Sequence, residues 1–134
     1  MRGLARGAMA LGLFTLACKG ADGDLPPTYR DVPVPMDRLA SAAARERGRV
    51  LFREHCALCH GVAGDGRGER REGFARPPQD FTSSEWRRRT TARRVFFALR
   101  EGKRGTAMPS WRALDDASLW DLTAHVLSIA KVDR

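Results

Sequence analysis

The stretch Cys56-Ala57-Leu58-Cys59-His60 decides the fold of this chain. In a Cys-x-x-Cys-His sequence, two thiols can bond covalently to one haem, and the histidine that follows can bind the haem iron. The thiols add to the two vinyl groups of the haem, and His60 is presented to the iron from beside Cys59. As a ligand the imidazole is neutral, and its second ring nitrogen needs a hydrogen-bond acceptor. The stretch therefore predicts one covalently bound haem c with its iron.

Two other kinds of site share part of this pattern. A structural zinc site needs about four ligands, and the remaining Cys18, His55 and His125 are far apart in the sequence. A closed zinc site would have to be assembled from distant segments. A redox-active dithiol is expected in a βαβ unit, and the sequence shows no such alternation of strands and helices. Both alternatives explain less of the sequence than a haem does.

Residues 1–17 are typical of an export signal. Arg2 and Arg6 precede an apolar run that reaches Ala17 and is too short to span a bilayer as a mature helix. We expect this leader to be removed and the protein to reach the periplasm. The residue that follows, Cys18, resembles the lipidated first residue of a bacterial lipoprotein, which would tether the protein to a membrane. Ordinary cleavage after Ala17 is the alternative.

The chain is basic, with a formal net charge of +8 that falls to +6 when Arg2 and Arg6 leave with the leader. A basic surface favours acidic partners or anionic membranes. The densest group of arginines runs from Trp86 to Arg89 and continues at Arg93 and Arg94. It is either a solvated face or a docking patch. Such a run also suits nucleic acid, but export argues against that partner. We expect redox protein partners with acidic docking faces, and no nucleic acid.

Residues 18–40 and 61–73 lack helical periodicity. The first segment contains four prolines and few apolar residues, so we expect an extended spacer between the membrane and the folded domain. The second contains five glycines and is expected to form a flexible loop.

Three segments have the pattern of amphipathic helices. The first begins at Ser41 and runs into the haem motif. The second is capped by Thr90 or Thr91 and closed by Gly102, and the third has Asp115 as its N-cap. No strand pattern of useful length is present. Residues 41–134 are therefore predicted to form one all-α domain, with three main helices and long loops wrapped around the haem.

Residues 41–134 resemble the small class I monohaem cytochromes c, and are similar to the cytochrome c domains of bacterial terminal oxidase subunits. The resemblance is carried by Gly48 and Phe52 in the first helix, Cys56 to Gly61, Pro77-Pro78, and the stretch from Gly105 to Ser110 before the last helix. It implies that Gly48 and Phe52 lie where the first and last helices cross. It also implies that a proline carbonyl near Pro77 or Pro78 accepts the proton of His60.

His125 departs from this family, which usually has Tyr or Phe at that position of the last helix. A histidine on an apolar helix face can be a ligand, but the family geometry places this position away from the iron. We expect His125 to pack in the core. His55, next to the motif, is expected to point away from the open face of the haem.

Met108 is the expected sixth ligand of the iron. It lies in the matching Gly-Thr-Ala-Met-Pro stretch between two predicted helices, and its soft thioether favours Fe(II) and raises the reduction potential. Met36, in the proline-rich segment, is a more distant candidate. With His60 and Met108 both bound to the iron, the protein transfers single electrons, has no catalytic residues and binds no small-molecule substrate. It is then a carrier or a complex subunit rather than an enzyme.

Two other functions remain open from the sequence, and both need an open sixth position on the iron. One is a gas-binding or sensor haem protein, and the other is a peroxidase-like enzyme with a nearby acid or base. Binding of carbon monoxide to the native reduced protein would favour either of them over the carrier.

Overall fold

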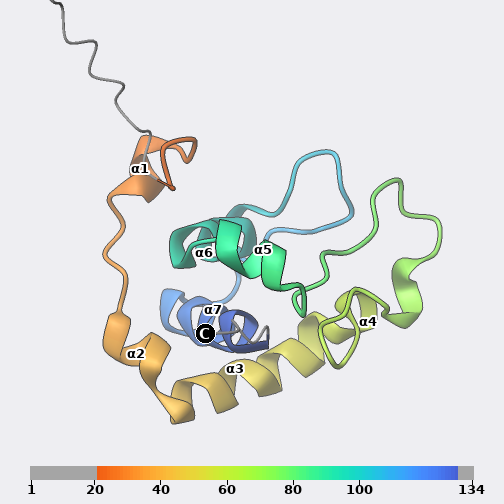
Figure 1. The fold of residues 1–134 in the computed structure, drawn as a ribbon, viewed down its shortest axis with the longest axis horizontal. Helices are drawn as coiled ribbons and strands as arrows, with labels where there is room; N and C mark the ends of the chain where they lie inside the picture. The colour runs from red at the N-terminus through yellow and green to blue at the C-terminus, as the bar shows by residue number, and fades with distance from the viewer. Residues whose placement is uncertain (1–20, 130–134) are drawn as a thin grey trace, which may run out of the picture.

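A computed structural model describes residues 21–129, and this part of the chain is all-helical, without strands (Figure 1). Its elements are α1 (Pro27–Arg30), α2 (Met36–Ala40), α3 (Ala42–His55), α4 (Ala57–His60), the 3₁₀ turn η1 (Glu69–Arg71), α5 (Ser84–Arg89), α6 (Ala92–Glu101) and α7 (Asp116–Ile129). The prediction of an all-α domain is confirmed for these residues. The predicted leader and Cys18 lie outside the described residues. Between residues 21 and 129, no helix combines the length and the apolar character that crossing a bilayer requires.

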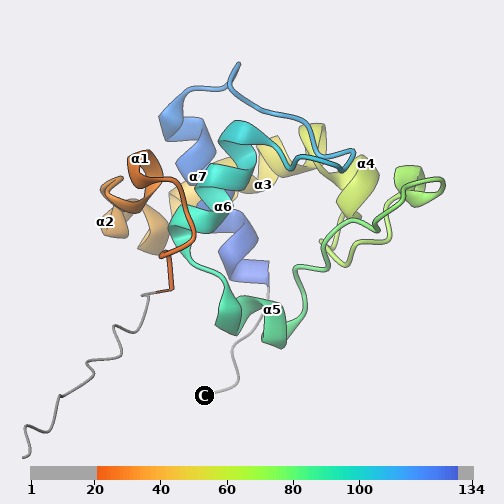
Figure 2. The ribbon, with the colours of Figure 1, turned by 90° about the horizontal axis from the view of Figure 1, so that it is seen from above.

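The crossing of α3 and α7 forms the centre of the fold (Figures 1 and 2). α3 begins where the Ser41 hydroxyl accepts a hydrogen bond from the Ala44 amide at 3.3 Å, as a capping serine does. Gly48 lies directly against the backbone of α7, and a Cβ atom at this position would collide with the carbonyl group of Asp121. One turn further, Phe52 is only 1% exposed. The predicted position of Gly48 and Phe52 at this crossing is confirmed.

α6 is the second predicted helix, and its ends match the sequence pattern. The Thr91 hydroxyl accepts a hydrogen bond from the Arg94 amide at 3.2 Å, and Gly102 ends the helix with a φ of 71°. The ring of Phe96 stacks on that of Trp120 in α7, with centroids 4.2 Å apart. α6 thus packs across α7 and leaves its other side to the pocket described below.

The third predicted helix, α7, begins one residue after its predicted cap. The Asp115 carboxylate accepts a hydrogen bond from the Ser118 amide at 2.7 Å. Leu119 and Leu122 are fully buried and Val126 is nearly so. The predicted N-cap and apolar face of this helix are therefore confirmed.

The segment from residue 21 to residue 40 differs from the extended spacer that the sequence predicts. It contains α1 and α2 and packs on the helices that follow (Figure 1). Leu25 is 6% exposed, and the ring of Tyr29 lies 4.7 Å from that of Phe97 in an edge-to-face arrangement. Arg38 of α2 pairs with the buried Asp121 of α7 at 2.7 Å. Pro27 is the first residue of α1, a position that suits its fixed φ. The ring contact of Tyr29 and the ion pair of Arg38 hold the segment on α6 and α7.

Candidate haem-binding site

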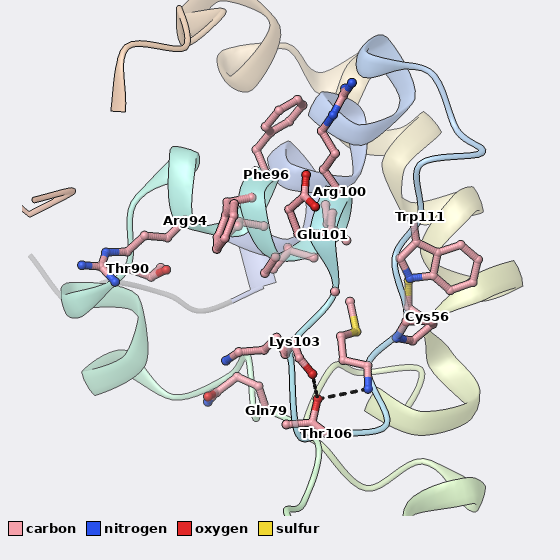
Figure 3. A pocket seen from close by; sticks show the side chains of 18 of the residues that line it. Cys56, Gln79, Thr90, Arg94, Phe96, Arg100, Glu101, Lys103, Thr106 and Trp111 are labelled. Carbon is pink, nitrogen blue, oxygen red and sulfur yellow. Dashed lines mark hydrogen bonds between the residues drawn. The ribbon is translucent and has the colours of Figure 1, made fainter. Parts of the chain in front are cut away.

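A wide pocket opens beside α6, between the end of α3 and the loop that precedes α7 (Figure 3). Its volume is about 1710 Å³, whereas pockets for small ligands usually measure roughly 300–1,000 Å³. The four residues predicted to hold a haem, Cys56, Cys59, His60 and Met108, all line this pocket. The structure therefore brings together the whole candidate site, although it lies on two segments far apart in the sequence.

The two cysteines flank a single tight turn. Cys56 lies between α3 and α4, and its carbonyl accepts hydrogen bonds from the amides of Cys59 and His60 at 3.2 and 2.9 Å. Both thiols are free, and Cys56 is buried. Burial, and to a lesser extent the neighbouring Cys59, raises the pKa of the Cys56 thiol to about 12. Both sulfurs are thus available on the pocket wall for thioether bonds, and that of Cys56 is protonated at neutral pH.

His60 is held by the segment that follows the glycine-rich loop. Its Nδ1 lies 3.1 Å from the carbonyl oxygen of Gln79. A carbonyl only accepts, so Nδ1 carries the proton, and the lone pair of Nε2 is left for a metal. The ring stacks on Phe81 with centroids 4.6 Å apart. Burial lowers the pKa of His60 below its usual value, so the imidazole is neutral, as a ligand to iron must be.

The acceptor for His60 differs from the expected one. The family resemblance implied a proline carbonyl near Pro77 or Pro78, but in the structure the carbonyl of Gln79 fills this role. The reason is the path of the chain: the Pro78 carbonyl faces Gly66, where a Cβ atom would come within 2.7 Å of its oxygen. The next carbonyl along the chain, that of Gln79, is the one that reaches the imidazole.

Met108 is positioned by a small hydrogen-bonded turn (Figure 3). The Thr106 hydroxyl accepts from the Met108 amide at 3.2 Å and donates to the Lys103 carbonyl at 2.7 Å. The Lys103 amide in turn donates to the Met108 carbonyl at 3.1 Å. The side chain is partly buried and packs against the hydrophobic core. Met36, the more distant candidate, is 67% exposed and does not line the pocket.

Trp111 is a residue of the pocket that sequence reasoning missed. Its Nε1 is buried and has no hydrogen-bond partner in the described part of the chain, although a buried donor without an acceptor is costly. Figure 3 shows the indole beside Cys56 on one wall of the pocket. A ligand with hydrogen-bond acceptor atoms would satisfy the Nε1 donor of Trp111. A haem has such acceptors in its two carboxylates and its thioether sulfurs. The only sequence signal for this role was the position of Trp111, an aromatic residue three positions after Met108.

The other two histidines have different surroundings. The ring of His125 lies 5.1 Å from that of Phe52, and His125 is not among the residues that line the pocket. The expected packing role of His125 is confirmed. His55 does line the pocket, with its ring 5.0 Å from that of Trp111. Between residues 21 and 129, no group of three or more His, Cys, Asp or Glu side chains is placed to hold a metal ion.

Comparisons with known proteins identify the family of the chain. A similar structure is found in a chain of the Kuenenia stuttgartiensis reducing HAO-like protein complex Kustc0457/Kustc0458, with 27% sequence identity and a TM-score of 0.61. The match covers 68% of this chain and 46% of that one, so this protein spans less than half of the matched chain. No curated protein matches the sequence. The family model described as cytochrome C oxidase, cbb3-type, subunit III matches residues 43–126, more than half of the chain, and this protein therefore belongs to that family of haem-containing electron-transfer domains.

Proposed function

We propose that this protein is a carrier of single electrons, or the electron-transfer subunit of a redox complex, with His60 and Met108 as the two axial ligands of one covalent haem c. The observation that carries the proposal is that Cys56, Cys59, His60 and Met108 line one pocket. When bound, the haem supplies an iron that gains and loses one electron.

Neighbouring residues fix the positions of the two proposed ligands, His60 and Met108. The Gln79 carbonyl fixes the tautomer of His60, and the stacked ring of Phe81 fixes its orientation. Thr106 and Lys103 hold the backbone of Met108. If the His60 imidazole and the Met108 thioether both held the iron, oxygen and peroxide would find no open position on it. The protein then has no catalytic residue and is not an enzyme by itself.

Partners are expected to be redox proteins that present acidic surfaces. Arg76, Lys103 and Arg104 are exposed and line the pocket, so a ring of positive charge would surround an exposed haem edge and steer an acidic partner toward it. The matched Kuenenia chain is part of a protein complex that is itself named as reducing, which supports the reading as a complex subunit. No nucleic acid and no small-molecule substrate is needed.

The cellular location follows from the N-terminal sequence. We propose a leader over residues 1–17, a lipidated Cys18 at a periplasmic membrane surface, and a cytochrome domain over residues 41–134 onto which residues 21–40 fold. The mass of the mature N-terminus, measured on protein purified from membranes, tests the leader and the lipid together. A mature chain that begins at Cys18 without added lipid would contradict the tether but leave electron transfer untouched.

The test of the ligands is the optical spectrum of the exported holo-protein in both oxidation states. We expect a low-spin spectrum with the weak charge-transfer band, at the red end of the ferric spectrum, that sulfur on iron produces. Met108→Ala should abolish this band and let the reduced protein bind carbon monoxide. Met36→Ala, which removes the exposed methionine, is the matched control and should change neither. A high-spin wild type that binds carbon monoxide would favour the gas-binding or peroxidase-like alternative.

A further inference from the structure

We propose that the basic face made by α5 and the first turn of α6 binds an anionic lipid surface. This basic face consists of five arginines of α5 and the start of α6. Arg88 and Arg89 are exposed, whereas Arg87, Arg93 and Arg94 are half-buried and already bond to other groups of the protein, Arg93 to Asp22 and Arg94 to Asp24 among them. Its orientation toward the membrane rests on the proposed lipidation of Cys18, whereas its affinity for lipid does not.

The chain is fixed to the start of α6 from its first described residue onward. The carbonyl of Ala21 accepts two hydrogen bonds from the guanidinium of Arg94, at 2.8 and 2.6 Å. The Asp22 carboxylate pairs with Arg93 at 3.2 Å and also accepts from the Thr91 hydroxyl. Leu25 is buried just beyond these contacts. The N-terminal segment therefore cannot act as a free spacer between the domain and a membrane.

The remaining tether is short. Only Lys19 and Gly20 separate Cys18 from Ala21, and three steps of about 3.8 Å between Cα atoms span at most roughly 11 Å. A lipid on Cys18 would thus hold Ala21, and with it the first turn of α6, within about a Debye length of the headgroups. α5 is brought to the same side, because Thr90 and Thr91 alone connect it to α6.

The basic face suits phosphate headgroups. Arg88 and Arg89 are exposed, and the partner of Arg89, Glu85 at 3.3 Å, is itself exposed. Such a surface ion pair contributes little to stability, so Arg89 can readily exchange Glu85 for another anion. The Nε of Arg87 donates to the Leu127 carbonyl at 3.1 Å, which attaches α5 to α7. A single lipid chain anchors a protein only weakly to a membrane. A basic patch on the protein commonly supplies the additional binding energy that stable anchoring needs.

This arrangement would also decide which side of the pocket a partner can reach. Arg89 and Arg94 of the basic face, together with Thr90, also line the pocket, and Figure 3 shows Thr90 and Arg94 on the side opposite Trp111. If that side faces lipid, a redox partner approaches past Lys103 and Arg104. A membrane is favoured over an acidic protein for the basic face because the tether holds lipid beside it at all times.

The test measures vesicle binding without the tether. The holo-protein is exported behind a cleavable signal so that the mature chain begins at Lys19, and it is sedimented with phosphatidylcholine vesicles that contain or lack phosphatidylglycerol. We expect binding at low salt only where phosphatidylglycerol is present. The double variant Arg88→Gln/Arg89→Gln should weaken binding about thirtyfold, as expected for two basic residues near an anionic surface.

The matched control is Arg70→Gln/Arg71→Gln. It removes the same charge from exposed side chains in the loop after α4, which lies at the other end of the molecule from the N-terminal entry in both views (Figures 1 and 2). Binding by this variant should match the wild type. An equal loss in both double variants, or a wild type that ignores phosphatidylglycerol, would overturn the proposal. The proposal would also be overturned if the Arg88→Gln/Arg89→Gln variant bound vesicles as the wild type does but transferred electrons more slowly to an acidic protein. Optical spectra of the same samples report haem ligation separately.

Discussion

His60 and Gln79 are joined by a contact of 3.1 Å between the imidazole Nδ1 and the backbone carbonyl, and the glycine-rich loop between them sets this contact. Gly64 and Gly66 have positive φ values of 74° and 73°. The Gly64 carbonyl accepts from the Phe81 amide at 2.7 Å, and the Gly66 amide donates to the His60 carbonyl at 2.8 Å. The sequence predicts a flexible loop here, but these contacts make it a set of tight turns that hold the segment containing Gln79 against the histidine.

Gly66→Ala should therefore change the reduction potential of the haem as well as the stability of the protein. An added Cβ would lie 2.7 Å from the Pro78 carbonyl oxygen, and relief of that clash moves the adjacent Gln79 carbonyl away from His60. We expect the reduction potential of the holo-protein to rise, because an imidazole with a weaker acceptor donates less charge to iron. Redox titration measures the change.

The control for this experiment is Gly73→Ala. Gly73 also has a positive φ, 81°, but nothing lies within 4 Å of an added Cβ. Both variants should lose about 1–3 kcal/mol from backbone strain. Only Gly66→Ala should shift the potential, and an equal shift in the two would show that loop strain, rather than the Gln79 contact, tunes the site.

Thr106→Val should loosen Met108. The hydroxyl of Thr106 bonds to both the Met108 amide and the Lys103 carbonyl, and valine keeps the shape while removing both contacts. A net loss of about 1 kcal/mol should let carbon monoxide displace Met108 about fivefold more readily in the reduced protein. A carbon monoxide titration measures this. Thr106→Ser retains the hydroxyl and should behave as the wild type, whereas equal affinities in all three proteins would exclude this role for the turn.

The elements that the sequence predicts correctly are those whose signal is local. α6 and α7 have apolar periodicity together with capping residues, Thr91 and Asp115, that are visible within a few positions. The haem motif likewise occupies five consecutive residues. α1 and α2 were missed because short proline-containing segments have little structure of their own, and tertiary contacts such as that of Tyr29 with Phe97 of α6 decide their conformation.

Two features of the site could not be predicted for a similar reason. The Gln79 carbonyl is a backbone group, so its role depends on the path of the chain around Gly66 and not on the side chain. The unpartnered Nε1 of Trp111 is a property of the folded pocket. Met108 was predicted from the sequence because it lies in a stretch that resembles a known family, and in the structure it lines the same pocket as His60.

Gly48→Ala should destabilise the protein even though alanine is the better helix former. On an exposed helix the change would stabilise by about 1 kcal/mol. Here the added Cβ meets the Asp121 carbonyl of α7, so α3 and α7 must separate, and overpacking of this kind costs about 1–3 kcal/mol. Urea unfolding of the holo-protein measures the net change in the free energy of unfolding. Ala43→Gly, exposed on the same helix, should lose only about 1 kcal/mol, and a Gly48→Ala variant more stable than the wild type would contradict the close crossing.

His125→Phe should reduce the sensitivity of the fold to acid. Burial, and to a lesser extent the neighbouring Arg49, lowers the pKa of His125 below its usual 6.5, while Glu46 acts in the opposite sense. The unfolded chain therefore binds this proton more readily than the native state, so stability is lost as the pH falls below about 6.5. Phenylalanine keeps the ring contact with Phe52 and removes the titration. Urea midpoints at about pH 7 and about pH 5 should fall less in the variant, and an equal fall would show that other groups cause the acid sensitivity.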